Sequence, residues 1–276
     1  MLKQRVITAF VLLFLILAVV FVLPAIWFDL FIALVIGIAV WEWSKMTGLT
    51  GLPARTAFLV VAVVLFAVLT HSPLSLTLAL SVGALFWIGA LILVCLYPQG
   101  KIAWANKPVL FLITLPLFFP GWLSFVYLRD QPYFAFHVLL MMGLVAAADI
   151  GAYFAGKAFG RHKLAPRVSP NKTWEGFVGG LLACCLLVLV AGLVFIMQVV
   201  QLNGMHWIKL FLSAILIAAT SVTGDLFESM VKRYRDIKDS GTILPGHGGM
   251  LDRIDGLTAA APVYALLLVF MQQDFL

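Results

Sequence analysis

A glycine-rich stretch near the C-terminal end, residues 238–255, combines carboxylates, cations and a histidine within an otherwise apolar chain. Its candidate catalytic side chains are Lys238, Asp239, His247, Asp252, Arg253 and Asp255. Carboxylate oxygens without a cysteine or histidine cluster favour Mg²⁺, which one or two carboxylates hold while phosphate oxygens complete its coordination. The stretch therefore predicts phosphoryl or nucleotidyl transfer, whose catalysis depends mainly on positioning and charge stabilisation.

The turn PGHGG within this stretch supplies a backbone with few side chains. Gly248 and Gly249 would allow backbone amides to approach a phosphate closely. Taken singly, the histidine would ordinarily make a hydrogen bond in a loop, and the glycines would ordinarily form turns. The prediction depends on the combination of carboxylates, cations and bare backbone.

A second group of polar residues precedes this stretch in an apolar segment. Helical spacing places Ser221, Asp225, either Glu228 or Ser229, and Lys232 on one face, and Arg233 follows directly. Lys232 and Arg233 could neutralise a polyphosphate, and Ser229 is a further candidate substrate contact. Asp225 lies seven residues before Lys232, which corresponds to roughly 10 Å of helix.

The apolar segment 133–157 repeats this arrangement. Asp149, Tyr153 and Lys157 recur at four-residue intervals and share one helix face, with Asp149 about 12 Å before the lysine. Two acids at one depth predict a common cavity that opens to the cytoplasm. Asp149 could instead form a structural ion pair, although an acid within a membrane is costly enough to favour a functional role. Small residues form a second stripe suited to close helix packing, namely Gly143, Ala147, Gly151 and Ala155.

The segment SPNKTWEG, residues 169–176, begins the next apolar run. Its proline interrupts a helix, and Asn171 or Thr173 could cap the helix that follows. Lys172 and the free amides of the helix N-terminus could bind an anion, while an ordinary capped helix with a surface lysine is the structural alternative. The candidate substrate-binding residues here are Ser169, Asn171, Lys172, Thr173 and Glu175.

These residues lie in a chain of extreme apolarity. The mean hydropathy is +1.10 and 63% of the 276 residues are hydrophobic, which excludes a soluble globular domain. We therefore predict an all-α, polytopic integral membrane protein. Its nine apolar runs of spanning length are 5–23, 26–42, 56–70, 74–97, 108–128, 133–157, 174–201, 208–231 and 256–272. The first run could be a signal peptide, but it is long and lacks a cleavage site, so we interpret it as a retained span.

The distribution of lysine and arginine predicts the orientation. With the N-terminus in the cytoplasm and the C-terminus outside, 16 of the 18 basic residues face the cytoplasm, and only Arg129 and Lys209 lie outside. The net charge of +6 is then a property of the cytoplasmic face and requires no nucleic acid. The three cysteines lie in apolar runs without metal-ligand spacing, as core residues do.

The two halves of the chain differ in polarity. Residues 1–130, with five spans and few ionisable residues within them, are predicted to form a membrane scaffold. Residues 131–276, with four spans, are predicted to form the catalytic region, in which cytoplasmic loops 158–173 and 232–255 carry the polar groups.

Two segments carry a resemblance to a known family. The run from Ser229 to Asp255, SMVKRYRDIKDSGTILPGHGGMLDRID, resembles the signature of the phosphatidate cytidylyltransferases, also called CDP-diacylglycerol synthases. The run from Asp149 to Gly176, DIGAYFAGKAFGRHKLAPRVSPNKTWEG, is similar to that family's upstream segment. The two segments cover about a fifth of the chain.

The resemblance implies an activity, a location and an assembly. It implies Mg²⁺-dependent transfer of CMP from CTP to phosphatidic acid, which gives CDP-diacylglycerol and pyrophosphate for phospholipid biosynthesis. Asp225 and Asp252 would be the metal-binding acids, and a second metal ion is left open. It further implies a homodimeric, multi-pass enzyme of the bacterial cytoplasmic (inner) membrane, with its active site facing the cytoplasm.

Three other functions remain to be compared. A transporter could use intramembrane acids as an ion path, but these acids gather in the inner third of their spans and do not cross the bilayer. Another lipid-active transferase, such as a polyprenol or dolichol kinase or an enzyme of prenyl-phosphate glycosyl donors, could use the same metal and cations. A non-catalytic scaffold is disfavoured, because buried acids would lower its stability without a functional benefit.

Overall fold

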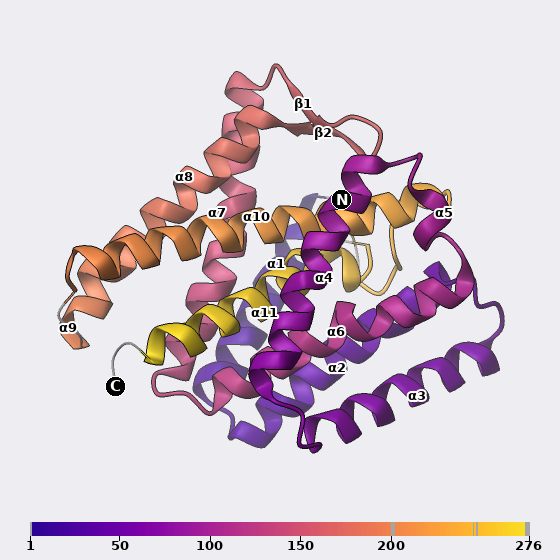
Figure 1. Ribbon diagram of the computed structural model, residues 1–276, viewed down its shortest axis with the longest axis horizontal. Helices are drawn as coiled ribbons and strands as arrows, with labels where there is room; N and C mark the ends of the chain where they lie inside the picture. Colours follow the sequence, from indigo (N-terminus) through magenta and orange to yellow (C-terminus); the bar gives the residue numbers. More distant parts are fainter. Residues whose placement is uncertain (1, 200–201, 245, 247, 274–276) are drawn as a thin grey trace.

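The computed structural model describes residues 2–199, 202–244, 246 and 248–273 (Figure 1). Almost all of the regular structure in these residues is helical. The helices are α1 (Leu2–Phe21), α2 (Ala25–Met46), α3 (Leu52–Thr70), α4 (Leu76–Leu96), α5 (Lys101–Trp104), α6 (Lys107–Arg129), α7 (Phe134–Phe159), α8 (Trp174–Ala191), the π-turn η1 (Gly192–Ile196), α9 (Met197–Val199), α10 (Gly204–Tyr234) and α11 (Leu251–Gln273).

Eight helical segments in the described residues are long and apolar enough to cross a membrane. They are α2, α3, α4, α6, α7, α8 with η1, α10 and α11, and they coincide with the second to ninth predicted spans. The first predicted span overlaps α1, whose apolar part, Phe10–Phe21, is shorter. The structure thus confirms a helical, polytopic protein, while the count of nine and the orientation of the ends stay predictions.

A small antiparallel hairpin is the element that the all-α prediction missed. Strand β1 (Lys163–Ala165) pairs with β2 (Ser169–Thr173) inside the segment predicted to be a plain loop (Figure 1). The strands are too short and too polar to give an alternating apolar pattern, so the sequence contained no usable strand signal. Thr173, at the end of β2, caps α8 by accepting a hydrogen bond from the Gly176 amide at 3.1 Å, as the sequence predicted for this residue.

The loop between the last two long helices is shorter than predicted. Helix α10 continues to Tyr234 and α11 begins at Leu251, so the connection comprises residues 235–250 instead of 232–255. We call this segment the α10–α11 loop. Asp252, Arg253 and Asp255 consequently lie in the first turns of α11, where a helix holds their side chains in register.

Small residues join α7 and α8 over their whole contact. A β-carbon added at Gly151 would lie 2.6 Å from the Gly179 carbonyl oxygen, and one added at Gly179 would collide with Ala155. A β-carbon added at Gly180 would likewise lie 2.7 Å from the Ala148 carbonyl oxygen. The predicted stripe of Gly151 and Ala155 therefore forms a helix interface in which backbones touch directly.

One hydrophobic core runs through both predicted halves of the chain. Helix α11 packs against α4 and α6, and α10 packs against α4. Trp43 of α2 donates from Nε1 to Thr114 Oγ1 of α6 at 3.0 Å and stacks on Phe227 of α10. The boundary near residue 130 stays a prediction, and the helices on its two sides share this core.

We predict that Gly179→Ala destabilises the protein by roughly 1–3 kcal/mol, because its methyl group would overpack the α7–α8 interface. Gly89→Ala in α4 is the matched control, since a β-carbon there meets nothing within 4 Å. Thermal unfolding of both purified variants in detergent measures the difference. Equal melting temperatures for the two variants would contradict the close packing.

Candidate active site

The crossing of α10 and α11 brings the acidic residues of the two helices together. A β-carbon added at Gly224 would collide with the Asp255 carbonyl, and one added at Gly256 would lie 2.6 Å from Ser221 Oγ. Only residues without a side chain permit so close an approach. Asp225 and Asp255, each adjacent in sequence to one of these glycines, are thereby held on facing helices.

A cavity of about 310 Å³ lies beside this crossing. It is lined by Val145, Asp149, Ser221, Asp225, Lys232, Asp239, Asp252, Arg253, Asp255 and Gly256. These residues come from α7, α10, the α10–α11 loop and α11. The predicted common cavity for Asp149 and Asp225 is therefore present, and five aspartates and two cations share its wall.

Two side chains contact the Asp225 carboxylate. Its Oδ2 lies 2.6 Å from Lys172 Nζ, and its Oδ1 accepts a hydrogen bond from Ser229 Oγ at 3.1 Å. Lys172 belongs to β2, so the hairpin reaches over to α10 through this ion pair. The side chain of Asp225 is still 37% exposed, which leaves part of the carboxylate open to the cavity.

Asp252 organises the loop that precedes it. Its Oδ2 accepts hydrogen bonds from the Ser240 amide at 3.0 Å, from Ser240 Oγ at 2.9 Å and from the Gly249 amide at 2.8 Å. Its Oδ1 lies 2.6 Å from Lys232 Nζ. One carboxylate thus fixes both ends of the loop segment 240–249 and also faces the cavity.

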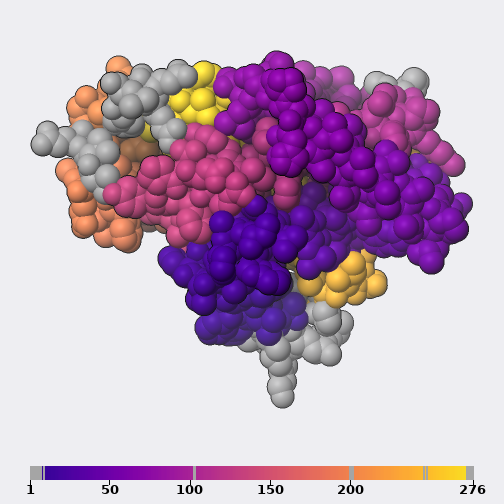
Figure 2. Space-filling model, turned by 90° about the horizontal axis from the view of Figure 1, so that it is seen from below, coloured from indigo at the N-terminus to yellow at the C-terminus, as the bar shows by residue number. Residues whose placement is uncertain are grey.

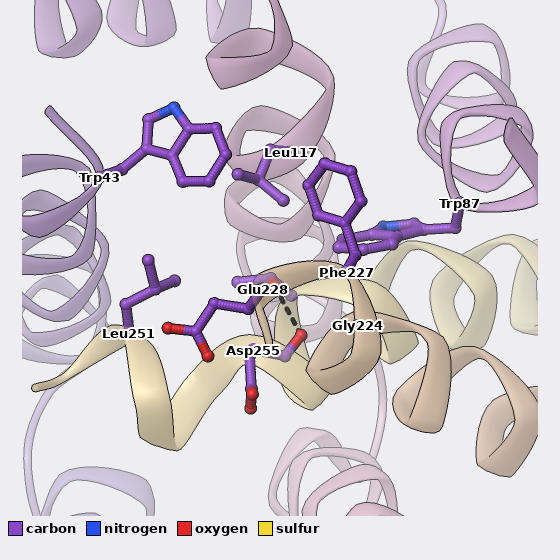
Figure 3. Close-up of a pocket in the computed structure, with 9 residues that line it drawn as sticks. Trp43, Trp87, Leu117, Gly224, Phe227, Glu228, Leu251 and Asp255 are labelled. Atoms are coloured by element: carbon purple, nitrogen blue, oxygen red, sulfur yellow. Dashed lines mark hydrogen bonds between the residues drawn. The ribbon is translucent and has the colours of Figure 1, made fainter. Parts of the chain in front are cut away.

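Lys232 connects this carboxylate with a more deeply buried one. Its Nζ lies 3.1 Å from Glu228 Oε2, one helical turn earlier in α10. Figure 3 shows Glu228 and Asp255 below the apolar side chains Trp43 and Leu117 in a small adjoining pocket. Asp255 lines this pocket and the main cavity, so it separates the apolar core from the polar site.

Glu42 of α2 is a site residue that the sequence reasoning missed. It is 3% exposed, and its Oε2 accepts hydrogen bonds from the Leu251 amide at 2.8 Å and from Ser240 Oγ at 3.2 Å. Figure 2 shows the light-orange segment that follows α10 at the surface beside the indigo N-terminal helices. An acid inside a predicted span was the available signal, and the prediction that residues 1–130 are scaffold left it unused.

Several predicted substrate-binding residues lie in or next to the hairpin and do not line the cavity. Glu175 accepts hydrogen bonds from the Arg161 and His162 amides and pairs with the His162 ring at 2.6 Å. Ser169 and Asn171 lie in β2, and Thr173 is the α8 cap. Asn171 is exposed and does not cap a helix.

The remaining predicted residues lie around the cavity mouth or apart from it. Arg233 donates to the Val168 carbonyl at 3.3 Å and so ties α10 to the hairpin. Lys157 is exposed, with its Nζ 5.8 Å from the Tyr153 ring centroid. Lys238 is exposed in the loop, and His247 lies outside the described residues.

Two glycines of the PGHGG turn leave room for neighbouring carboxylates. Gly248 has a φ of +83°, which favours glycine, and a β-carbon there would lie 2.9 Å from Asp252 Oδ2. A β-carbon at Gly249 would collide with Ser240 Oγ and press on Glu42. The turn therefore folds around Asp252 and Glu42.

The chemistry of the donor groups fits Mg²⁺. Asp225 and Asp252 both present hard carboxylate oxygens to one cavity, and Mg²⁺ is commonly held by one or two carboxylates together with substrate phosphates. Among the described residues, no preformed cluster of three or more His, Cys, Asp or Glu side chains could hold an ion alone. The cavity thus suits a magnesium ion that arrives with a phosphate compound.

A bundle of spanning helices around a cavity of carboxylates and cations defines a membrane enzyme that handles phosphate compounds. The chain belongs to the cytidylyltransferase family, whose model matches residues 3–271, and it is therefore a nucleotidyltransferase.

Bacterial relatives match the chain over nearly its whole length. It is 43% identical to the phosphatidate cytidylyltransferase of Pseudomonas aeruginosa, over 97% of both chains. It is 37% identical to the enzyme of the same name from Haemophilus influenzae, over 98% of this chain and all of the relative. The Brucella abortus phosphatidate cytidylyltransferase is 37% identical over 90% of this chain and 87% of its own.

We predict that Lys232→Met destabilises the protein by roughly 3–5 kcal/mol, because it leaves Glu228 and Asp252 buried without their shared cation. Lys163→Met in β1 removes an exposed lysine and is the matched control, with little expected change. Thermal unfolding in detergent at neutral pH measures both. Equal stability of the Lys232 variant and the wild type would show that Lys232 is not needed to compensate these acids.

Proposed function

We propose that the protein catalyses the Mg²⁺-dependent transfer of CMP from CTP to phosphatidic acid, with CDP-diacylglycerol and pyrophosphate as products. The observation that carries this proposal is the cavity in which Asp149, Asp225 and Asp252 meet Lys232 and Arg253 between spanning helices. The names of the bacterial relatives supply the substrates, which the cavity alone does not identify.

The chemistry needs no nucleophile from the protein. A phosphate oxygen of phosphatidic acid attacks the α-phosphorus of CTP, and a new P–O bond forms as the bond to the bridging oxygen of the β-phosphate breaks. Pyrophosphate leaves with that electron pair. Because nucleophile and leaving group are both anionic, the main task of the site is to reduce repulsion between charges.

Cations on three elements are suited to this task. Lys172 on the hairpin, Lys232 on α10 and Arg253 on α11 surround the acids of the site. We assign them the role of neutralising the triphosphate and the lipid phosphate. Lys172 and Lys232 already lie 2.6 Å from carboxylates, so an arriving phosphate group would compete for ammonium groups that the site holds in place.

Asp225 and Asp252 are the residues that we propose as magnesium ligands. A bound Mg²⁺ would withdraw charge from the α-phosphate and from the leaving pyrophosphate. Ser229 donates to Asp225 Oδ1, and the Ser240 and Gly249 amides donate to Asp252 Oδ2, so hydrogen bonds orient one oxygen of each carboxylate while the other lies beside a lysine. Whether a second metal ion joins them is part of the same proposal.

We place the enzyme in the bacterial cytoplasmic membrane as a homodimer, with the cavity toward the cytoplasm. The clustering of basic residues around the cavity and the bacterial origin of the relatives support this placement. Phosphatidic acid would remain anchored in the lipid by its acyl chains while its phosphate enters the cavity.

The decisive experiment supplies the purified protein with α-labelled CTP, phosphatidic acid and Mg²⁺. We expect a labelled liponucleotide and an equal amount of pyrophosphate, with neither formed when EDTA is present. In a parallel reaction, a polyprenol and γ-labelled CTP replace the two substrates. Label transfer only in this second reaction would overturn the proposal in favour of a lipid kinase.

We predict that Asp225→Asn and Asp252→Asn each lower kcat on the order of a thousandfold, because each removes one charged ligand of the same ion. The double variant should be scarcely slower than either single variant, as expected for residues that act as one unit. Asp236→Asn in the same loop is the control, because its φ of +53° tolerates asparagine well. Multiplicative losses in the double variant would contradict a shared ligand role.

A further inference from the structure

A buried carboxylate from the N-terminal half of the chain holds the start of α11. Glu42 lies in α2, about 200 residues before the groups it binds, and it is 3% exposed. Its Oε2 accepts from the Leu251 amide, the first amide of α11, at 2.8 Å. The first amides of a helix have no partner within the helix, so Glu42 caps α11 from another element.

Ser240 connects Glu42 to a proposed magnesium ligand. Its hydroxyl lies 2.9 Å from Asp252 Oδ2 and 3.2 Å from Glu42 Oε2, and the residue is 1% exposed. Any shift of Glu42 would therefore move a group that fixes Asp252. The path from α2 to the cavity passes through the Ser240 hydroxyl, whose single proton is shared between the two carboxylate oxygens, and through no solvent-exposed side chain.

The loop is fitted closely around this carboxylate. A β-carbon at Gly241 would collide with Glu42, and one at Gly249 would lie 2.6 Å from its Oε2. Glu42 Oε1 is buried and has no hydrogen-bond partner among the described residues. A buried carboxyl oxygen without a donor is costly, and two glycines make room for this side chain, which indicates a role beyond packing.

A second tie joins α2 to the other end of the same loop. Arg235 Nε donates to the Met46 carbonyl, in the last turn of α2, at 2.6 Å. The end of α2 thus holds the loop where it leaves α10 and again where it enters α11. Lys238 and Asp239, the latter in the cavity wall, lie between these two ties.

We propose that Glu42 is a positioning residue for cytidylyl transfer, which sets the start of α11 and thereby the placement of Asp252 in the cavity. This inference rests on the proposed function for its activity readout. The role depends on reach: the side chain must span from α2 to the Leu251 amide with an acceptor oxygen. Charge is secondary, because the residue contacts the site through neutral donors.

Three substitutions separate reach from charge. Glu42→Gln keeps the length and one acceptor oxygen, so we expect kcat within about fivefold of the wild type. Glu42→Asp keeps the charge but is too short, and Glu42→Ala loses both, so each should lower kcat on the order of a hundredfold with little change in KM for CTP. An active Asp variant beside an inactive Gln variant would overturn the role assigned to reach.

Asp29→Ala is the matched control for Glu42→Ala. Asp29 is an acid on the same helix, but it pairs with Arg129 at the opposite end of α2 from Glu42. It should lower the melting temperature without lowering kcat of the folded fraction. Equal loss of kcat in both alanine variants would show that Glu42 is only a structural residue of α2 and would overturn the positioning role.

Hydrogen exchange tests the same tie without any activity. The Leu251 amide should exchange at least tenfold faster in Glu42→Ala than in the wild type, whereas amides in α7 should be unchanged. Unaltered exchange at Leu251 would overturn the inference. If wild-type protein makes no CDP-diacylglycerol, the proposed function fails while the exchange result still decides on the tie; if the wild type is active and Glu42→Ala keeps its kcat, only this inference fails.

Discussion

The close crossing of α10 and α11 is the constraint on which the rest of the site depends. Gly224 and Gly256 let the two backbones approach until Asp225 and Asp255 face one cavity, and no larger residue would fit at either position. Bringing several carboxylates together in an apolar surrounding is costly unless cations and donors compensate them. Each neighbouring element supplies part of that compensation: Lys232 comes from α10, Lys172 from the hairpin, and the Ser240 and Gly249 amides from the loop.

This requirement explains features that looked unrelated in the sequence. The hairpin is short and exposed, yet its Lys172 forms an ion pair with Asp225. Glu175 holds the residues that precede the hairpin by accepting a hydrogen bond from the Arg161 amide. The glycines of the PGHGG turn were predicted to let backbone amides approach a phosphate. In the structure the Gly249 amide already donates to Asp252, so this glycine positions the proposed magnesium ligand.

The sequence predicted the spanning helices well because lipid imposes a length and a composition that can be counted. It also placed Asp149 and Asp225 at one depth, since helical rise is constant, and the shared cavity follows from that. It failed where structure depends on contacts between distant segments. The hairpin has no periodic pattern, and Glu42 holds the start of α11 through a hydrogen bond from a distant segment that no local pattern encodes.

Glu42 illustrates how such a residue can be recognised. Asp149 and Asp225 were predicted to be functional because an intramembrane acid is costly, whereas Glu42 of WEWSK lies at the end of the second predicted span, three residues before Lys45, and was assigned to the scaffold. Its partners are the Leu251 amide of α11 and the Ser240 hydroxyl of the loop, which carry no charge and so do not appear in a charge pattern. A single acid at the end of a span can therefore be as informative as a cluster, since groups from elsewhere in the fold must compensate its desolvation. In this protein those groups are the first amide of α11 and Ser240, so a helix of the predicted scaffold directly contacts the loop and the helix that line the candidate active site.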